Sequence, residues 1–188
     1  MKKILLIGNG PCIFDSECGK EIDNFDGDIV RFNQYKIQGY EKYIGMRTNV
    51  WFVGKFDRPN SLENYRGVYL YMPDFNSQML ADVVTANLDN TVTIMGRRCI
   101  QDLRTILQNK HNFFPTAGML AIYYFIRYYE VYIHGFDFFT RGHEYFDNID
   151  YLNKKIEPHI PAFHDPMAEK TFVMQLIDNK KVKYFERA

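Results

Sequence analysis

The feature that most constrains the fold is a short, uninterrupted apolar run near the start of the chain. Ile4-Leu5-Leu6-Ile7 has no polar alternation, and such a strand is typical of the centre of a parallel sheet, where both faces are buried. The run ends in Gly8-Asn9-Gly10-Pro11. Glycines after such a strand allow a ligand to approach the backbone closely, as in the first turn of nucleotide-binding α/β folds. We therefore expect a parallel sheet whose first turn contributes to a ligand site.

Further strands are predicted along the chain, separated by loops and helices. Residues 77–88, 99–109 and 119–129 are expected to be helical, and a last helix should open at 164–169. This alternation predicts a mostly parallel sheet with helices on both faces. With 188 residues and no repeat or linker, the chain is expected to form one Rossmann-like α/β domain over residues 1–188. The expected strands are 4–7, 29–32, 50–53, 68–71, 91–95, 131–134 and 182–185.

The composition restricts the function and the setting. The 23 basic and 23 acidic residues leave no formal net charge, so the chain has no general attraction for nucleic acid. Cys12, Cys18 and Cys99 have no metal-ligand spacing and cannot all pair with one another, which favours a reduced, cytoplasmic setting. The first apolar run is too short for a signal peptide or a membrane span. Peripheral contact with the inner membrane and the oligomeric state stay open.

Polar residues follow several of the predicted strands, where open α/β sheets bind ligands. The amide of Asn9 can donate and accept toward a ribose, base or phosphate, the alternative being a turn residue with a left-handed backbone. Asn33 and Gln34 stand at the end of the second predicted strand. Asp26-Gly27-Asp28 looks like the Asp-x-Asp metal site of many nucleotide-sugar enzymes. Because it precedes a strand instead of following one, we interpret it as a turn.

The stretch over residues 115–137 combines an expected helix with an expected strand. Thr116, Ala117 and Gly118 open the helix, where free backbone N–H groups and the helix dipole make a natural phosphate site. The strand that follows ends at Gly135, at the edge of the sheet where ligands bind. An ordinary helix beside a strand is the simpler alternative.

Four separated blocks carry a resemblance to a known family. The blocks are LLIGNGP with EIDNFDGDIVRFNQ and GMRT, then PTAGMLAIYYF with VYIHGFD, then HEYFD, and last HDPMAE. In this order they resemble the large, small, third and very small motifs of the eukaryotic-type sialyltransferase family. The chain is also similar to the bacterial lipooligosaccharide sialyltransferases, which share the GNGP turn. The form P-[ST]-x-G-M followed by a strand that ends in Gly-Phe is the most specific part.

The resemblance implies a GT-A-like variant of the fold and a metal-independent, inverting transfer of sialic acid from a CMP-sugar to a glycan hydroxyl. It implies that His164 is the general base, and that His143 and Tyr145 donate to the departing phosphate. A neutral imidazole can accept a proton at working pH, and donors aimed at the leaving phosphate favour the transition state. No cofactor is implied. The residues implied to hold the CMP-sugar are Gly8, Asn9, Gly10, Asn33, Gln34, Thr116, Ala117, Gly118 and Gly135.

Departures from the animal enzymes leave the setting and the substrates open. The cysteines of their motif-linking disulfide are not kept, and the chain is shorter, which favours a bacterial or viral cytoplasmic protein of lipooligosaccharide biosynthesis or protein glycosylation. The acceptor and linkage are not determined, and Kdo or a related acid sugar could replace sialic acid. Two rival functions remain. One is a catalytically silent CMP-sugar-binding module, and the other is a diphosphokinase-like nucleotide enzyme that shares the GNGP turn and needs magnesium and ATP.

Overall fold

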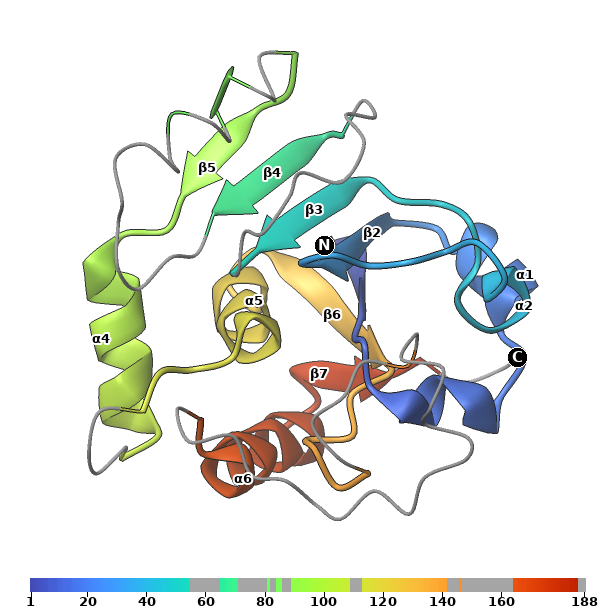
Figure 1. Cartoon of the computed structure of the whole chain (residues 1–188). Helices are drawn as coiled ribbons and strands as arrows, with labels where there is room; N and C mark the ends of the chain where they lie inside the picture. Colours follow the sequence, from blue (N-terminus) through green and yellow to red (C-terminus); the bar gives the residue numbers. More distant parts are fainter. Residues whose placement is uncertain are drawn as a thin grey trace.

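The structure is a computed structural model in which seven strands form a single sheet (Figure 1). The strand order is β5-β4-β3-β2-β1-β6-β7, and every neighbouring pair is parallel, so the predicted parallel sheet is confirmed. The strands are β1 (Lys2–Ile7), β2 (Asp28–Phe32), β3 (Val50–Val53), β4 (Gly67–Leu70), β5 (Val92–Ile94), β6 (Tyr129–His134) and β7 (Val182–Tyr184). The residues that the structure describes are 1–54, 65–70, 81, 84–85, 89–108, 113–141, 146 and 164–185.

The order of the strands reverses beside β1. From β1 the chain adds strands on one side out to β5, and it then crosses the sheet so that β6 pairs with the other side of β1. β1 and β6 pair from Lys2 opposite Tyr129 to Ile7 opposite His134. In open α/β sheets, ligands bind outside the carboxyl ends of the strands at such a reversal. The topology therefore singles out the loops after Ile7 and His134.

Helices cover both faces of the sheet, as predicted (Figure 1). Successive side chains of a strand point to opposite faces, so Ile4 and Leu6 join one core, and Leu5 and Ile7 join the other. The first core is covered by α4 (Arg97–Ile106), α5 (Ala117–Phe125) and α6 (Pro166–Asp178). The second core is covered by η1 (Pro11–Asp15), α1 (Gly19–Asp23) and α2 (Glu41–Ile44).

The boundaries of α5 differ from the helix predicted over 119–129. The helix begins at Ala117 because the Thr116 side chain accepts a hydrogen bond from the Met119 N–H and caps its start. It ends at Phe125, and Tyr129 already belongs to β6, where the backbone pairs with β1. Most of the helix predicted at 77–88 lies outside the described residues.

A buried arginine fixes the connection between α2 and β3. The side chain of Arg31, on β2, is 1% exposed. Its guanidinium donates hydrogen bonds to the carbonyls of Ile44, Gly45 and Arg47 and to the Thr48 hydroxyl. Burial lowers the pKa of Arg31 to about 10. The GMRT block of the sequence is therefore a connection held from inside the core.

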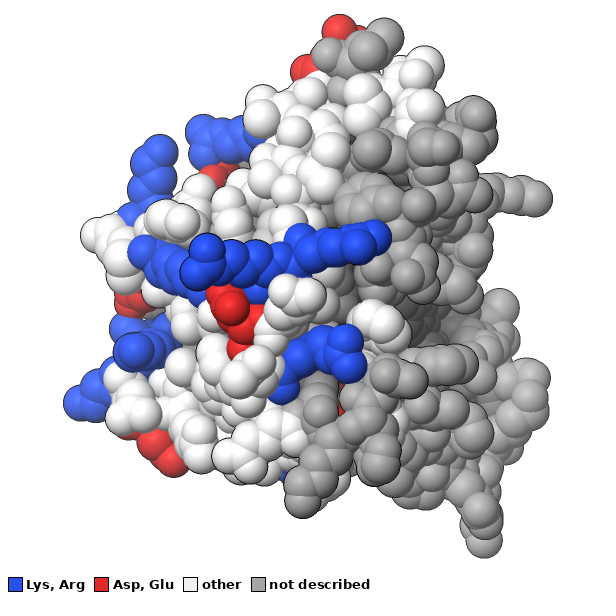
Figure 2. Space-filling view, turned by 90° about the vertical axis from the view of Figure 1, so that its left-hand side faces the viewer, with Lys and Arg blue, Asp and Glu red and all other residues white. Residues whose placement is uncertain are grey.

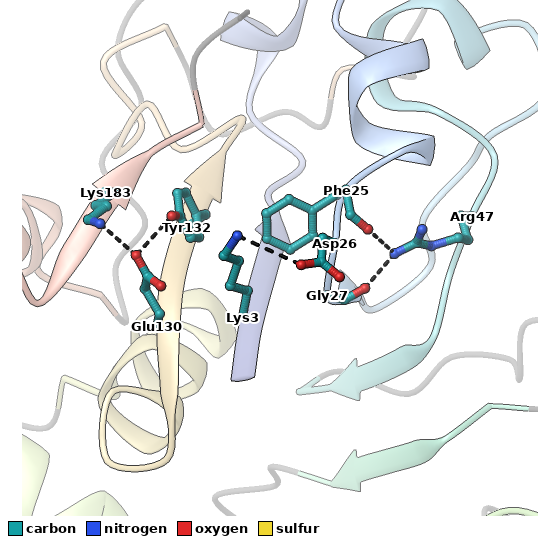
Figure 3. Close-up of polar contacts among 8 residues, drawn as sticks. All are labelled: Lys3, Phe25, Asp26, Gly27, Arg47, Glu130, Tyr132 and Lys183. Carbon is teal, nitrogen blue, oxygen red and sulfur yellow. Dashed lines mark hydrogen bonds and ion pairs between the residues drawn. The ribbon is translucent and has the colours of Figure 1, made fainter. Parts of the chain in front are cut away.

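Polar contacts cross the sheet near the amino-terminal part of its central strands (Figure 3). Glu130 accepts hydrogen bonds from the Tyr132 hydroxyl and from Lys183 of β7, at 2.9 and 2.5 Å. Lys3 forms an ion pair with Asp26 at 3.9 Å. The Asp-x-Asp segment thus lies where β2 begins, as interpreted from the sequence, and far along the strands from the loops after Ile7 and His134.

The face that carries α4 is rich in Lys and Arg side chains (Figure 2). The helix contributes Arg97 and Arg98 at its start and Arg104 in its last turn, against a single acidic residue. Ile94 at the end of β5 and Ile106 on α4 are 46% and 44% exposed. No helix in the described part of the chain is long and apolar enough to cross a membrane.

We predict that Gly8→Ala destabilises the fold. A Cβ at position 8 would lie 2.4 Å from the carbonyl oxygen of Gly135, and both backbones belong to the paired β1 and β6 ends. The free energy of unfolding, measured by urea denaturation, should fall by about 2–3 kcal/mol. Gly96→Ala is the control, because no atom lies within 4 Å of the added methyl group. Equal losses in the two variants would contradict the prediction.

Candidate functional site

The loops after β1 and β6 pack directly on each other and form the floor of the candidate site. The Gly8 N–H donates to the His134 carbonyl at 2.7 Å, and the Gly10 N–H donates to the Gly135 carbonyl at 3.0 Å. A Cβ at Gly10 would lie 2.7 Å from that same Gly135 oxygen. The close backbone approach predicted for a ligand at Gly8 and Gly10 is therefore first an approach of the two loops to each other.

Two asparagines join the ends of the central strands above this floor. The Asn9 Nδ2 donates to the Phe32 carbonyl at 3.1 Å, while the Asn33 Oδ1 accepts from the Gly54 N–H at 2.8 Å. Asn33 has a left-handed backbone with φ 51°, whereas Asn9 does not, so the alternative of a left-handed turn residue is wrong for Asn9. The Asn9 Oδ1 has no partner among the described residues. Gln34, next in the chain, is exposed.

The start of α5 is only partly free to bind an anion. The Thr116 N–H donates to Glu169 Oε1 and its hydroxyl donates to Glu169 Oε2, both at 2.7 Å. This corrects the expectation that the N–H groups here are all free, because a carboxylate of the protein itself occupies Thr116. The N–H groups of Ala117 and Gly118 have no partner among the described residues. Gly118 packs against Phe136, whose ring would lie 2.6 Å from an added Cβ.

Glu169 is a buried carboxylate in the first turn of α6. Its side chain is 3% exposed, and burial raises the pKa of Glu169 to about 7. The hydrogen bonds from Thr116 act in the opposite direction, and the neighbouring Asp165 carboxylate adds to the rise. Asp165 caps α6 by accepting from the Ala168 N–H at 3.0 Å. The HDPMAE block thus contains both the helix cap and the buried acid.

His164 stands immediately before the cap of α6 and is half-buried. Its Nδ1 lies 2.6 Å from the carbonyl oxygen of Phe114. Because a carbonyl can only accept, we assign the ring hydrogen to Nδ1, which leaves Nε2 with the lone pair of the neutral imidazole. The ring stacks on Phe139 with an interplanar angle of 3° and centroids 6.3 Å apart. The arrangement gives His164 the tautomer that a general base needs.

Asp137 adds a carboxylate to the loop after β6, and sequence reasoning gave it no role. Its Oδ1 accepts from the Phe139 N–H at 3.1 Å, while its Oδ2 is buried without a partner among the described residues. Burial raises the pKa of Asp137. Burial and the nearby Asp137 also raise the pKa of Cys12 to about 12, so this thiol stays protonated. The available signal was the position of Asp137 directly after a strand that ends in Gly-Phe.

The structure brings most of the predicted site residues to the carboxyl edge of the sheet. His143 and Tyr145 lie outside the described residues, so their roles stay predictions. Within the described ranges, no three His, Cys, Asp or Glu side chains are placed to hold a metal ion together. The three cysteines are free thiols. The predicted residues found at this edge are Gly8, Asn9, Gly10, Asn33, Gln34, Thr116, Ala117, Gly118, Gly135 and His164.

Comparisons with known proteins give one family and one fold. Residues 1–69 match the sequence model of the family described as "Glycosyltransferase family 29 (sialyltransferase)". Two solved structures are similar, "Crystal Structure of a Mammalian Sialyltransferase" with a TM-score of 0.73 and "Crystal Structure of a Mammalian Sialyltransferase in complex with Gal-beta-1-3GalNAc-ortho-nitrophenol" with 0.72. Each is 19% identical, over 100% of this chain and 70% of that chain. A search of curated protein sequences gave no match.

The structural likeness shows the fold, which is the GT-A-like α/β fold of these sialyltransferases and agrees with the predicted fold class. The family match supports a sialyltransferase assignment and, with it, a glycosyltransferase.

We predict that Glu169 makes the protein less stable as pH rises toward neutrality. Burial raises its pKa from the ordinary 4.5 to about 7, so the folded state holds this proton more tightly than the unfolded chain does. The stabilisation is complete below pH 4.5 and is lost as pH rises through about 7. Relative to Glu169→Gln, which cannot titrate, the wild type should lose up to about 3 kcal/mol of unfolding free energy across this window.

Urea denaturation at a series of pH values measures this difference. Asp178→Asn changes an exposed carboxylate at the other end of α6 and is the matched control. Its stability should follow the wild type at every pH. Parallel curves for Glu169→Gln and the wild type would contradict the prediction.

Proposed function

We propose that this chain, assigned to the sialyltransferase family, is a metal-independent, inverting enzyme that moves sialic acid or a related acid sugar from a CMP-sugar to a glycan hydroxyl. The observation that carries the proposal is the hydrogen bond between His164 Nδ1 and the Phe114 carbonyl, because it leaves Nε2 as a proton acceptor. The family match over residues 1–69 supports the chemistry of the first half of the site. The role of His164, outside that match, rests on the geometry and on the HDPMAE block.

The proposed reaction is a single displacement at the anomeric carbon of the donor sugar. His164 Nε2 takes the proton of the acceptor hydroxyl while the acceptor oxygen forms a bond to that carbon. The bond between the carbon and the phosphate oxygen of CMP breaks at the same time, and its electron pair leaves on the phosphate. Because attack and departure occur on opposite faces of the carbon, the configuration inverts. The proton ends on the imidazole, and CMP leaves as a phosphate monoester.

The leaving phosphate gains charge and needs hydrogen-bond donors. The N–H groups of Ala117 and Gly118 open α5 and have no partner among the described residues, so they suit this role together with the helix dipole. His143 and Tyr145 are proposed as further donors from the sequence alone. Asn9 is proposed to hold the nucleotide, since its Oδ1 can still accept a hydrogen bond from it.

We predict that CMP binds in the presence of EDTA with a Kd on the order of 1–100 µM, whereas UDP, GDP and ATP do not bind. The sharpest variant is Asn33→Asp, which keeps the Oδ1 that accepts from the Gly54 N–H but replaces the amide by a negative charge. It should weaken CMP binding about tenfold or more, because the charge repels phosphate. Asn179→Asp adds the same charge at the exposed end of α6 and serves as control. Calorimetric titration measures both.

The same protein samples separate the proposal from its rivals by CMP release from CMP-sialic acid. His164→Gln should keep CMP binding and lower the rate by about 100-fold or more, because the proton acceptor is lost. Unchanged release in His164→Gln would remove His164 as base. No release even from the wild type, with CMP still bound, would favour the catalytically silent module. Magnesium-dependent binding of ATP in place of CMP would favour the diphosphokinase-like enzyme.

We propose in addition that the protein works in the cytoplasm and touches an anionic membrane surface through the α4 face. This rests on the arginines of α4 and on exposed Ile94 and Ile106 beside them, a combination that suits lipid headgroups. We predict co-sedimentation with vesicles that contain anionic lipid and none with neutral vesicles. The double variant Arg97→Glu, Arg98→Glu should release the protein, while Lys180→Glu at the end of α6 should not. Equal binding to both vesicle types would contradict this contact.

A further inference from the structure

Two residues of α6 hold the same short segment in front of α5. His164 bonds to the Phe114 carbonyl at 2.6 Å, and Glu169 bonds to the N–H and hydroxyl of Thr116 at 2.7 Å each. Pro115, between the two contacts, is buried. The segment Phe114–Thr116 is thus held at both ends by side chains five residues apart on α6. We call these contacts together the α6 clasp.

We propose that Glu169 is a positioning residue that acts through the α6 clasp: its carboxylate keeps the Phe114–Thr116 segment against α6, so that the Phe114 carbonyl holds the His164 ring in its working tautomer. The inference rests on the proposed role of His164 as base. It gives Glu169 no contact with the substrate.

A simple structural role explains Glu169 poorly. Thr116 already caps α5 through the bond from the Met119 N–H, so the helix start does not need a second acceptor. An ionised carboxylate buried in the protein is costly unless it is paired, and the described residues provide Glu169 with no cation. The hydrogen bonds from Thr116 only partly offset this cost. A shorter or neutral side chain would fill the space more cheaply, so the carboxylate must serve something beyond packing.

The clasp also makes the site sensitive to pH. Burial raises the pKa of Glu169 to about 7, so its charge changes close to neutrality. The charged or titratable groups that face the clasp are His164 and Asp165 from α6, while Arg104 of α4 lies over the Phe114 ring with 5.2 Å to the ring centre. When Glu169 takes up a proton, one of its oxygens becomes a donor and the bonds to Thr116 rearrange. The position of the Phe114 carbonyl then changes with pH.

The first test reads the His164 ring and does not depend on enzymatic activity. The full chain is labelled with ¹⁵N-histidine, and the His164 signal is assigned by its loss in His164→Gln. In the wild type we expect a neutral imidazole with the hydrogen on Nδ1. In Glu169→Gln the nitrogen shifts should move toward a mixture of tautomers, whereas Asp178→Asn should leave them unchanged. Unchanged His164 shifts in folded Glu169→Gln would overturn the proposal.

The second test measures the rate of CMP release from CMP-sialic acid against pH. Glu169→Gln should lower kcat about 10- to 100-fold, because a displaced base is a poor one, with little change in KM. It should also remove one of the two ionisations from the acid side of the profile. Glu169→Asp, which restores the charge, should restore part of kcat. A lower melting temperature with an unchanged kcat profile would mean a structural role only and would overturn the proposal.

The two tests separate the inference from the proposed function. A wild type that shows the Nδ1–H tautomer and the Glu169-dependent shift, yet releases no CMP, would refute the transferase and leave the clasp standing. Where Glu169→Gln does not fold, Thr116→Val removes the hydroxyl contact from the other side and preserves shape. The same shift of the His164 signal is then expected, and its absence would overturn the proposal.

Discussion

The site depends on the backbone contact between Gly8 and Gly135, at the point where the strand order reverses. Because neither residue has a side chain, the ends of β1 and β6 approach until the N–H groups of one loop bond to the carbonyls of the other. No side chain from this floor can then fill the space above it. Asn9 and Asp137, next to the glycines, are carried to the rim. An ordinary hydrogen-bond requirement of two buried loops thereby creates an open edge lined with polar groups.

The second constraint is the attachment of the last helix. α6 follows residues 151–163, which lie outside the described part of the chain, and its start is fixed in the structure by the bonds to Phe114 and Thr116. The first of these bonds sets the tautomer of His164, and the second buries a carboxylate. Both contacts reach the segment in front of α5, whose N-terminus is the proposed phosphate site. The base and the leaving-group donors are therefore held by a single short stretch of backbone.

The sheet could be predicted from the sequence because its strands are continuous apolar runs, and a run such as Ile4–Ile7 has few alternatives to a buried parallel strand. The edge at which ligands bind followed from the same topology. The partner of Thr116 could not be predicted, because Glu169 is 53 residues away and nothing local indicates the contact. The helix start was placed too late because the Thr116 cap was read as a ligand site and not as a helix signal. The functions of Gly8 and Gly10 were also assigned to a ligand, since a sequence does not distinguish close approach by a ligand from close approach by another loop.

The pairing of β1 with β6 has a consequence for how the chain assembles. The first strand made on the ribosome is the central one, and one of its edges is completed only by residues 129–134, after β2 to β5. Until then, the hydrogen-bonding groups of Ile4 to Ile7 on that edge have no strand partner, and their apolar side chains lack the cover of α5. Parallel pairing over such a sequence distance is slow, and unpaired edges in partly folded chains favour aggregation. The same arrangement that places two distant loops in contact at the site makes this protein dependent on rapid completion of its own synthesis.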